Sequence, residues 1–232
     1  MFTRLDSNHK HVSRRSSVYA RNVVAASQPL AAQAGVQILR NGGNAVDAAI
    51  ATAITLTVVE PTMNGIGSDA FVIVSDNHGI HGFNGSGRSP AAWTPERFAG
   101  HDNMPEHGWD TVTVPGAVDT WVQLSDRFGQ LPFEKLFDSA INYAAQGFAV
   151  SPVIAAGWAR AAEEFGYLEG FRTIFMPNGR APTAGEAFQS EAMANTLGEI
   201  ADSRGESFYR GRLASRIVAD AARFDGALTE QD

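Results

Sequence analysis

The chain has 232 residues, of which 44% are hydrophobic, and it contains no cysteine. This length is enough for one large domain or two small ones, and the lack of cysteine excludes disulfides, thiolate metal sites and a cysteine nucleophile. The net charge of −7 argues against a nucleic acid as the main partner.

The charge is unevenly distributed along the chain. The first 21 residues hold five basic residues and one acidic residue, a charge of +4, which leaves −11 for the remainder. We expect residues 1–21 to form a basic, flexible arm and residues 22–232 to form one partial domain. A nucleic-acid tail and a transit peptide are the alternative interpretations of the arm.

No apolar segment typical of a secretory signal follows these N-terminal charges. The longest apolar run, Ala45–Val59, contains an aspartate and several threonines, so it is too short and too polar to span a bilayer. We therefore expect a cytoplasmic protein without membrane attachment, with a periplasmic or secreted location as the alternative.

Two helices are predicted near the N-terminus. Apolar residues at helical spacing indicate a helix from Leu30 to Arg40, which ends at Asn41-Gly42-Gly43. A second helix runs from Ala45 to about Val59, with Asn44 as its N-cap and Asp47 in its first turn. Because this helix is apolar nearly all round, we expect it to be buried between layers.

A β-hairpin is predicted next. Two runs rich in β-forming residues, Phe71–Ser75 and Ile80–Asn84, flank the turn Asp76–Gly79. Thr111–Val114 predicts a further short strand that ends at Pro115-Gly116.

The rest of the chain is predicted to be mostly helical. The expected helices are Ala117–Phe128, Leu131–Gln146, one that Ser151-Pro152 begins, Ser190 to about Ala201, and Gly211–Arg223. A helix pair, a hairpin and then mostly helices predict the class α+β, without a clear domain boundary.

Gly65–Ala70 matches the G-x-G-x-x-G/A pattern of a dinucleotide-binding loop. Such a loop needs a strand before it and a helix after it, whereas here a helix precedes and a strand follows. We therefore reject a nucleotide site, and we expect Gly65 and Gly67 to provide positive φ angles or a close backbone approach.

Other catalytic motifs are incomplete. Asn84–Arg88 contains a serine but has one spacer residue too few for a nucleophile elbow. None of the four histidines at positions 78, 81, 101 and 107 has the spacing of a metal ligand. The sequence selects no Ser/His/Asp triad, although it does not exclude one.

Three segments together carry a resemblance to a known family. They are "VVAASQPLAAQAGVQILRNGGNAVDAAIATAITLTVVEPTMNGIG", "TVTVPGAVDTWVQLSDRFGQLPFEKLFDSAINYAAQGFAVSP" and "ESFYRGRLASRI". From about residue 14 to residue 232, the chain resembles the N-terminal, large-subunit part of the γ-glutamyltransferases, also called γ-glutamyltranspeptidases.

This resemblance implies an N-terminal nucleophile hydrolase, a four-layer αββα sandwich made as a precursor that cleaves itself. Cleavage in such enzymes frees a threonine at the start of a C-terminal small subunit. Its hydroxyl attacks the γ-glutamyl carbonyl, its own α-amine acts as the base, and the acyl-enzyme passes to water or an amino acid. The implied partners are that small subunit and a γ-glutamyl or related amide, and no metal or organic cofactor is implied.

The nucleophilic threonine of the family is expected beyond residue 232. Thr229 is not that residue, because Thr229–Asp232 is typical of the N-cap and first turn of a helix. We expect the chain to be a fragment or one piece of a processed precursor, and to be inactive and unstable by itself, since half a sandwich exposes apolar surface and strand edges.

Arg88 is the candidate substrate-binding residue. The family's large-subunit arginine holds the substrate α-carboxylate and lies four residues before a proline, whereas Arg88 lies two residues before Pro90. The alternative is a solvated loop arginine. Ser68-Asp69 also replaces a more glycine-rich run, and we expect Asp69 to cap the turn rather than to line the cleft.

Three functions remain open at this point. The first is transfer or hydrolysis of glutathione-type γ-glutamyl amides. The second is the activity of a related acylase or amidase with another acyl donor. The third is a non-catalytic, truncated remnant.

Overall fold

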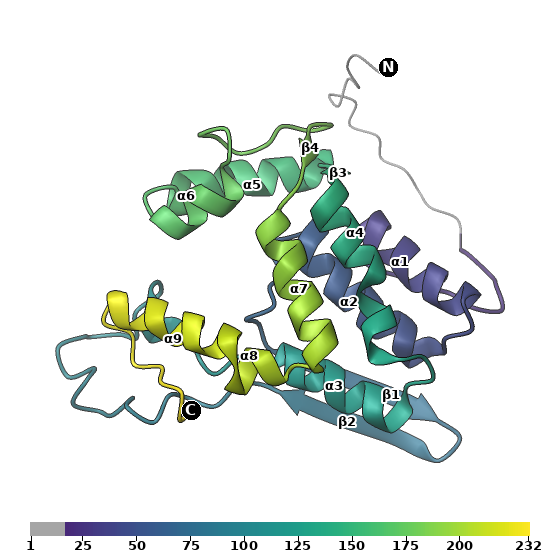
Figure 1. Ribbon diagram of the computed structural model, residues 1–232, viewed down its shortest axis with the longest axis horizontal. Helices are drawn as coiled ribbons and strands as arrows, with labels where there is room; N and C mark the ends of the chain where they lie inside the picture. Colours follow the sequence, from purple (N-terminus) through teal and green to yellow (C-terminus); the bar gives the residue numbers. More distant parts are fainter. Residues whose placement is uncertain (1–16) are drawn as a thin grey trace.

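The computed structural model describes residues 17–232, and helices dominate it (Figure 1). The predicted arm at 1–21 lies largely outside the described residues. The elements are α1 (Pro29–Arg40), α2 (Ala45–Val59), β1 (Ala70–Asp76), β2 (Gly79–Gly85), η1 (Trp109–Thr111), α3 (Ala117–Phe128), η2 (Phe133–Phe137), α4 (Asp138–Gln146), β3 (Phe148–Ala149), α5 (Pro152–Phe165), α6 (Glu169–Phe175), β4 (Ala187–Phe188), α7 (Glu191–Ser203), α8 (Glu206–Arg210) and α9 (Arg212–Arg223).

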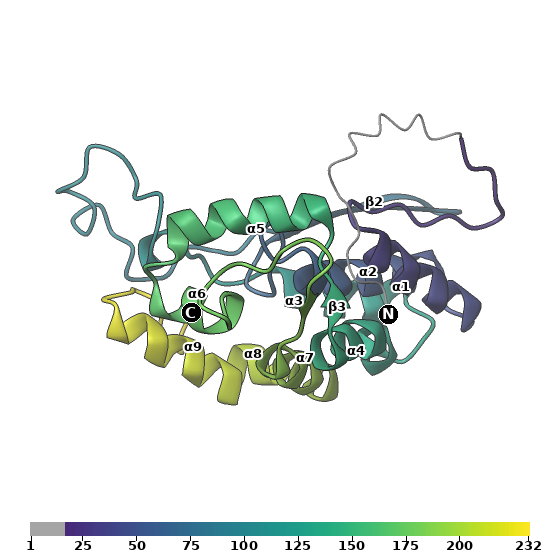
Figure 2. The same cartoon turned by 90° about the horizontal axis from the view of Figure 1, so that it is seen from above.

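Several of the helices lie in two rows. Seen from above, α5 runs along one long side of the molecule, and α9, α8, α7 and α4 follow one another along the other side (Figure 2). The mixture of helices and small antiparallel sheets confirms the predicted α+β class. No helix in the described part of the chain combines the length and apolarity needed to cross a membrane.

The helix pair α1–α2 forms as predicted. Asn44 caps α2, since its Oδ1 accepts from the main-chain N–H groups of Val46 and Asp47 at 2.9 and 3.0 Å. The Asp47 carboxylate completes a capping box by accepting from Asn44 N at 2.9 Å. As predicted, α2 is buried, and it packs against α1, α3, η2 and α4.

The predicted hairpin is also present. Strands β1 and β2 pair antiparallel, with Val72 opposite Phe83. The carboxylate of Asp76 accepts from the N–H groups of His78 and Gly79, and Gly79 takes a positive φ of 136° in the turn. One face packs on α3, where Phe83 contacts the ring of Phe128 at a centroid distance of 5.9 Å.

The other face of the hairpin carries exposed apolar side chains. Phe71, Ile73 and Ile80 are 71%, 80% and 77% exposed. They share a face because side chains alternate along a strand and because Ser75, two residues after Ile73, lies opposite Ile80. The hairpin therefore covers the helices with one face and leaves the other uncovered within the described chain.

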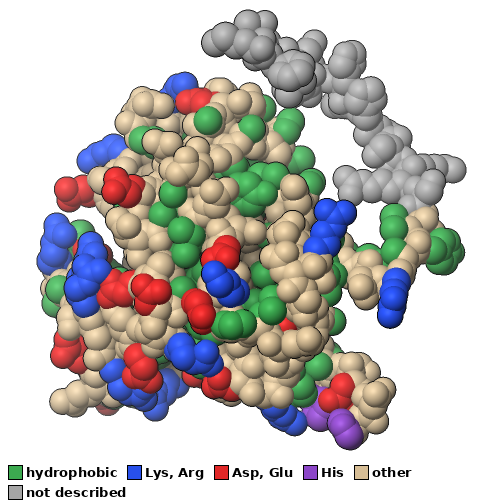
Figure 3. All heavy atoms as spheres, turned by 45° about the vertical axis from the view of Figure 1, so that its right-hand side comes forward, with side chains coloured by type: hydrophobic (Ala, Val, Ile, Leu, Met, Phe, Trp, Pro, Cys, Tyr) green, Lys and Arg blue, Asp and Glu red, His purple; other side chains and the backbone are tan. Residues whose placement is uncertain are grey.

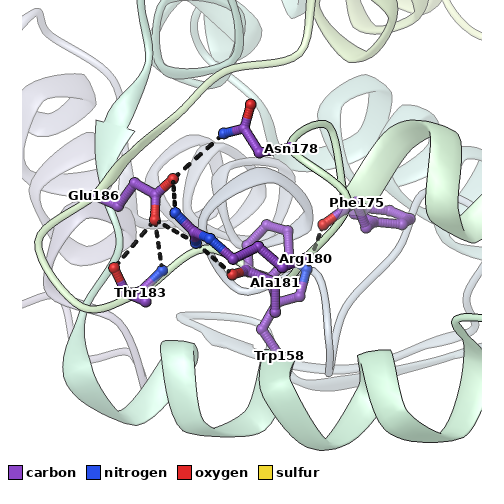
Figure 4. A network of polar contacts seen from close by, with 7 residues as sticks. All are labelled: Trp158, Phe175, Asn178, Arg180, Ala181, Thr183 and Glu186. Atoms are coloured by element: carbon purple, nitrogen blue, oxygen red, sulfur yellow. Dashed lines mark hydrogen bonds and ion pairs between the residues drawn. The ribbon is translucent and has the colours of Figure 1, made fainter.

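A cluster of aromatic side chains lies under α5. Trp158 is fully buried, its Nε1 donates to the carbonyl of Phe175 at 2.9 Å, and its ring lies 4.7 Å from that of Phe188. Figure 4 shows the loop that covers this cluster, in which Glu186 faces Arg180 and Thr183.

The surface carries mixed charge. On the face drawn in Figure 3, acidic and basic side chains lie interspersed, with hydrophobic side chains between them. Ion pairs such as Arg212 with Glu199 and Arg204 with Asp126 link the helices at the surface.

Two predicted elements are wrong. Thr111–Val114 is not a strand. Trp109–Thr111 forms a 3₁₀ turn, and Val112–Val114 pairs with no strand of the described chain. The helix predicted over Leu131–Gln146 is divided into η2 and α4. Phe133, Leu136 and Phe137 all enter the core from the 3₁₀ turn η2, which replaces the first part of that helix.

Candidate substrate-binding site around Arg88

A cavity of about 400 Å³ lies beside Arg88. Four segments of the chain surround it: the end of β2 with the glycine-rich loop after it, the turn before α3 with the start of α3, the end of α8, and the residues up to Asp232. The lining residues are Asn84–Arg88, Val114–Gly116, Asp119, Tyr209, Arg210 and Glu230–Asp232.

The loop and the turn cross with their backbones in direct contact. A Cβ atom on Gly87 would lie 1.6 Å from the carbonyl oxygen of Val114, and one on Gly116 would lie 1.9 Å from that of Gly85. At the same crossing, Val114 N donates to the carbonyl of Arg88 at 3.0 Å. Glycine is therefore required at 87 and 116, since any side chain there would separate the two segments.

The segment Gly65–Ala70 supports this crossing. The carbonyl oxygen of Ser68 accepts from Gly116 N and Ala117 N at 3.2 and 2.8 Å, so it caps the start of α3. The Asp69 carboxylate accepts from Gly87 N at 3.1 Å. Asp69 thus holds the Arg88 loop rather than capping its own turn, which corrects the expectation from sequence.

The expected reason for Gly65 and Gly67 is also wrong. Neither is among the described glycines with a positive φ. A Cβ on Gly67 would meet no atom within 4 Å, and one on Gly65 would lie 3.5 Å from the Ser68 hydroxyl. As predicted, a helix precedes this segment and a strand follows it, an order that does not present a helix N-terminus to a pyrophosphate.

Arg88 holds a main-chain oxygen across the cavity. Its Nε donates to the oxygen of Asp232 at 3.1 Å, and its Nη2 donates to the same atom. The Asp232 carboxylate accepts from Ala91 N at 2.7 Å. Partial burial opposes ionisation of this carboxyl, but the hydrogen bonds from Ala91 and Thr229 and the charge of Arg88 hold its pKa below the usual value.

Thr229 begins a helical turn, as predicted. Gln231 N donates to the Thr229 hydroxyl at 3.3 Å, and Thr229 N donates to the Asp232 carboxylate at 2.8 Å. The Asp232 carboxylate thus makes the N3 half of a capping box, while the Thr229 hydroxyl caps the second position of the turn.

Tyr209 is a site residue that the sequence did not single out. Its hydroxyl donates to the carbonyl of Pro115 at 2.8 Å and accepts from Asp119 N at 2.9 Å. Burial raises the pKa of Tyr209 to about 12, so the phenol stays protonated at neutral pH. One feature of the sequence could have pointed to Tyr209: it lies in "ESFYRGRLASRI", one of the three segments that carry the resemblance.

The histidines considered from sequence do not join this site. His81 lies on the hairpin, 3.2 Å from Asp76 and 3.0 Å from a guanidinium nitrogen of Arg127. His107 pairs with Glu164 at 3.5 Å. Within the described residues, no group of three or more His, Asp or Glu side chains is arranged to hold a metal ion.

Comparison with known proteins identifies the family. The sequence profile of the family described as Gamma-glutamyltranspeptidase matches residues 31–232. The chain is 34% identical over 221 residues to the glutathione hydrolase-like YwrD proenzyme of Bacillus subtilis, covering 94% of this chain and 42% of that protein. It is 34% identical over 224 residues to the oxamate amidohydrolase proenzyme of Klebsiella pneumoniae, with coverages of 94% and 42%.

A solved structure agrees with these matches. The cephalosporin acylase from Bacillus halodurans superposes with a TM-score of 0.92 and 45% identity, covering 100% of this chain and 45% of that protein. The chain thus spans less than half the length of these three proteins. The profile match and the superposition together establish that the chain belongs to the gamma-glutamyltranspeptidase family and corresponds to its N-terminal part.

Proposed function

We propose that this chain is the large-subunit portion of a self-processing amidase or transferase, and that Arg88 binds a carboxylate of the acyl donor. The supporting observation is that Arg88 lines the cavity of about 400 Å³ beside the glycine-rich loop and the turn before α3. A planar guanidinium is suited to hold a carboxylate.

The names of two relatives favour a donor with a carboxylate. Glutathione and oxamate are both amides that carry a carboxylate; one relative is named as glutathione hydrolase-like and the other as an oxamate amidohydrolase. For this chain we propose γ-glutamyl amides, in which the α-carboxylate lies four carbons from the scissile carbonyl. The likeness to a cephalosporin acylase favours a second candidate, the activity of a related acylase with another acyl donor.

The proposed chemistry takes place on a threonine of the C-terminal small subunit. Its hydroxyl oxygen bonds to the donor carbonyl carbon, the amide C–N bond breaks, and the hydroxyl proton passes through the threonine α-amine to the leaving amine. Water or an amino acid then takes the acyl group. No described residue of this chain is assigned a part in bond making, so we propose that the 232-residue segment alone does not turn over donor.

The uncovered face of the hairpin supports a partner subunit. Phe71, Ile73 and Ile80 together form an apolar strip on paired strands, and all three are more than two-thirds exposed. Exposed apolar strips of this kind are typical of surfaces that another chain covers. We propose that the C-terminal part of the full-length protein packs on this face.

Kinetics of an Arg88→Ala variant test the carboxylate site. The full-length, processed protein is assayed with γ-glutamyl p-nitroanilide and with glutaryl p-nitroanilide, which keeps the carboxylate and lacks the amino group. We expect KM to rise about tenfold or more for both donors, because both lose the guanidinium. Arg160→Ala, which removes an exposed arginine on α5, serves as the control. An unchanged KM in Arg88→Ala would reject the proposed role of Arg88.

A further inference from the structure

The backbone is held by hydrogen bonds on both sides of the Arg88 side chain. Gly87 N, just before it, donates to the carboxylate of Asp69 at 3.1 Å. The carbonyl of Arg88 itself accepts from Val114 N at 3.0 Å. Arg88 is exposed and its guanidinium ends a long, flexible side chain, so these two backbone anchors determine where the side chain starts.

Tyr209 fixes the turn that provides the second anchor. It donates to the carbonyl of Pro115, the residue after Val114, and it accepts from Asp119 N in the first turn of α3. The N-cap of α3 is Gly116, which has no side chain to offer, so the Tyr209 hydroxyl takes the place of a capping group. Because both hydrogen-bonding functions of the hydroxyl are used, Tyr209 acts on the turn and not on a substrate.

The crossing transmits the position of the turn to the loop. Gly87 lies directly against the carbonyl of Val114, where even a Cβ atom would not fit. No side chain separates the two segments, so a shift of the turn displaces the backbone at Arg88 by a similar amount. A clamp for a carboxylate depends on placement within about half an ångström.

We propose that Asp69 and Tyr209 are positioning residues for the carboxylate clamp: Asp69 holds the loop before Arg88, and Tyr209 holds the turn that binds the Arg88 carbonyl. This inference rests on the proposed role of Arg88. It gives a function to Asp69 and to the tyrosine of "ESFYRG".

Substitutions of Asp69 test the first anchor in the full-length, processed protein. Asp69 is exposed, so its variants are expected to fold. Asp69→Ala removes the acceptor for Gly87 N, and we expect KM for γ-glutamyl p-nitroanilide to rise about fivefold to tenfold while kcat stays within about twofold. Asp69→Asn keeps an oxygen acceptor and should restore KM to within about twofold. An unchanged KM in Asp69→Ala, or an Asp69→Asn variant as impaired as Asp69→Ala, would overturn the inference for this residue.

A double-mutant cycle tests the second anchor. Tyr209→Phe should raise KM by a similar factor, and in the Arg88→Ala background it should cause no further rise, because a positioning residue acts through the side chain that it positions. Ser151→Ala removes a capping hydroxyl from α5, away from the cavity, and controls for lost stability. Additive effects of Tyr209→Phe and Arg88→Ala would overturn the role of Tyr209.

The outcomes separate this inference from the proposed function. If Arg88→Ala leaves KM unchanged, the carboxylate site itself is rejected. If Arg88→Ala raises KM while Asp69→Ala and Tyr209→Phe do not, only the positioning inference is rejected. If Tyr209→Phe does not fold, the KM values of Asp69→Ala and Asp69→Asn decide whether the positioning inference is kept or rejected.

Discussion

Asp47 is a buried carboxylate whose hydrogen bonds join parts of the chain that lie 83 residues apart. It accepts from Asn44 N at the start of α2, and from Gln130 N and Leu131 N after the end of α3, at 2.9 to 3.2 Å. The sequence identified Asp47 as a first-turn residue of α2. The long-range contacts were not visible, because they depend on how α3 packs against α2.

An Asp47→Ala variant should have a lower free energy of unfolding than the wild type. Three main-chain N–H groups would lose their acceptor, and unsatisfied donors cost about 1–3 kcal/mol each, so we expect the full-length protein to lose about 3 kcal/mol or more. The measurement is the midpoint of thermal unfolding, compared with that of Asp138→Ala. Asp138 has a 65% exposed side chain at the start of α4 and should tolerate the change within about 0.5 kcal/mol. Equal midpoints for the two variants would contradict this account.

At the scale of elements, the helix pair and the hairpin could be predicted because their signals are local. Asn44 and Asp47 define the start of α2, and Asp76–Gly79 define the turn of the hairpin. The crossing of the Arg88 loop with the turn before α3 could not be predicted from either segment alone. It depends on Gly87 and Gly116 being brought together, whereas the glycines of the recognised motif, Gly65 and Gly67, are not required by the described structure.

The failed predictions have the same physical origin. Val112–Val114 has a β-rich composition, but a strand needs a partner, and one backbone hydrogen bond, from Val114 N to the carbonyl of Arg88, joins this segment to the Arg88 loop in the described chain. The helical pattern of Leu131–Gln146 was present, but its first part forms the 3₁₀ turn η2, from which Phe133 and Phe137 enter the core. Tertiary packing therefore overrode local preference in both segments.

The loop between α6 and β4 should respond to acid through Glu186. Its carboxylate accepts from Arg180 at 2.8 and 3.3 Å and from Thr183 N at 2.9 Å, and these bonds lower the pKa of Glu186 from 4.5 to about 2. Because the folded-state pKa is lowered, the stabilisation is complete above pH 4.5 and is lost as the pH falls towards 2. The group is partly exposed, so we expect a contribution of less than about 1 kcal/mol.

Glu186→Gln provides the measurement for this loop. At pH 7 the variant should unfold at a slightly lower temperature than the wild type, and the difference should shrink as the pH falls from 4.5 to 2.5. Glu191→Gln, a change in the first turn of the next helix, serves as the comparison. A difference that stays constant over this pH range would exclude Glu186 as the titrating group.

At the scale of the whole molecule, the described chain has one well-covered side and one uncovered sheet. Helix α3 lies behind the hairpin, with α2 packed on α3, and the outer face of the hairpin presents Phe71, Ile73 and Ile80. The resemblance to a family of two-subunit enzymes predicted such an apolar sheet face for a large-subunit portion, and the exposed fractions agree with that expectation.

An Ile73→Lys substitution should have opposite effects on the segment and on the full-length protein. Residues 1–232 expressed alone should self-associate through the apolar strip, and a lysine in its centre should increase the monomer fraction, measured by analytical ultracentrifugation. In the full-length protein, the same lysine would be buried against the proposed partner surface without a counter-charge, so processed, active enzyme should decrease severalfold. Val153→Lys is the matched control, because Val153 is also 80% exposed but lies on α5. If both lysines have the same effect on the yield of active enzyme, the outer face of the hairpin is not the surface that joins the two parts of the enzyme.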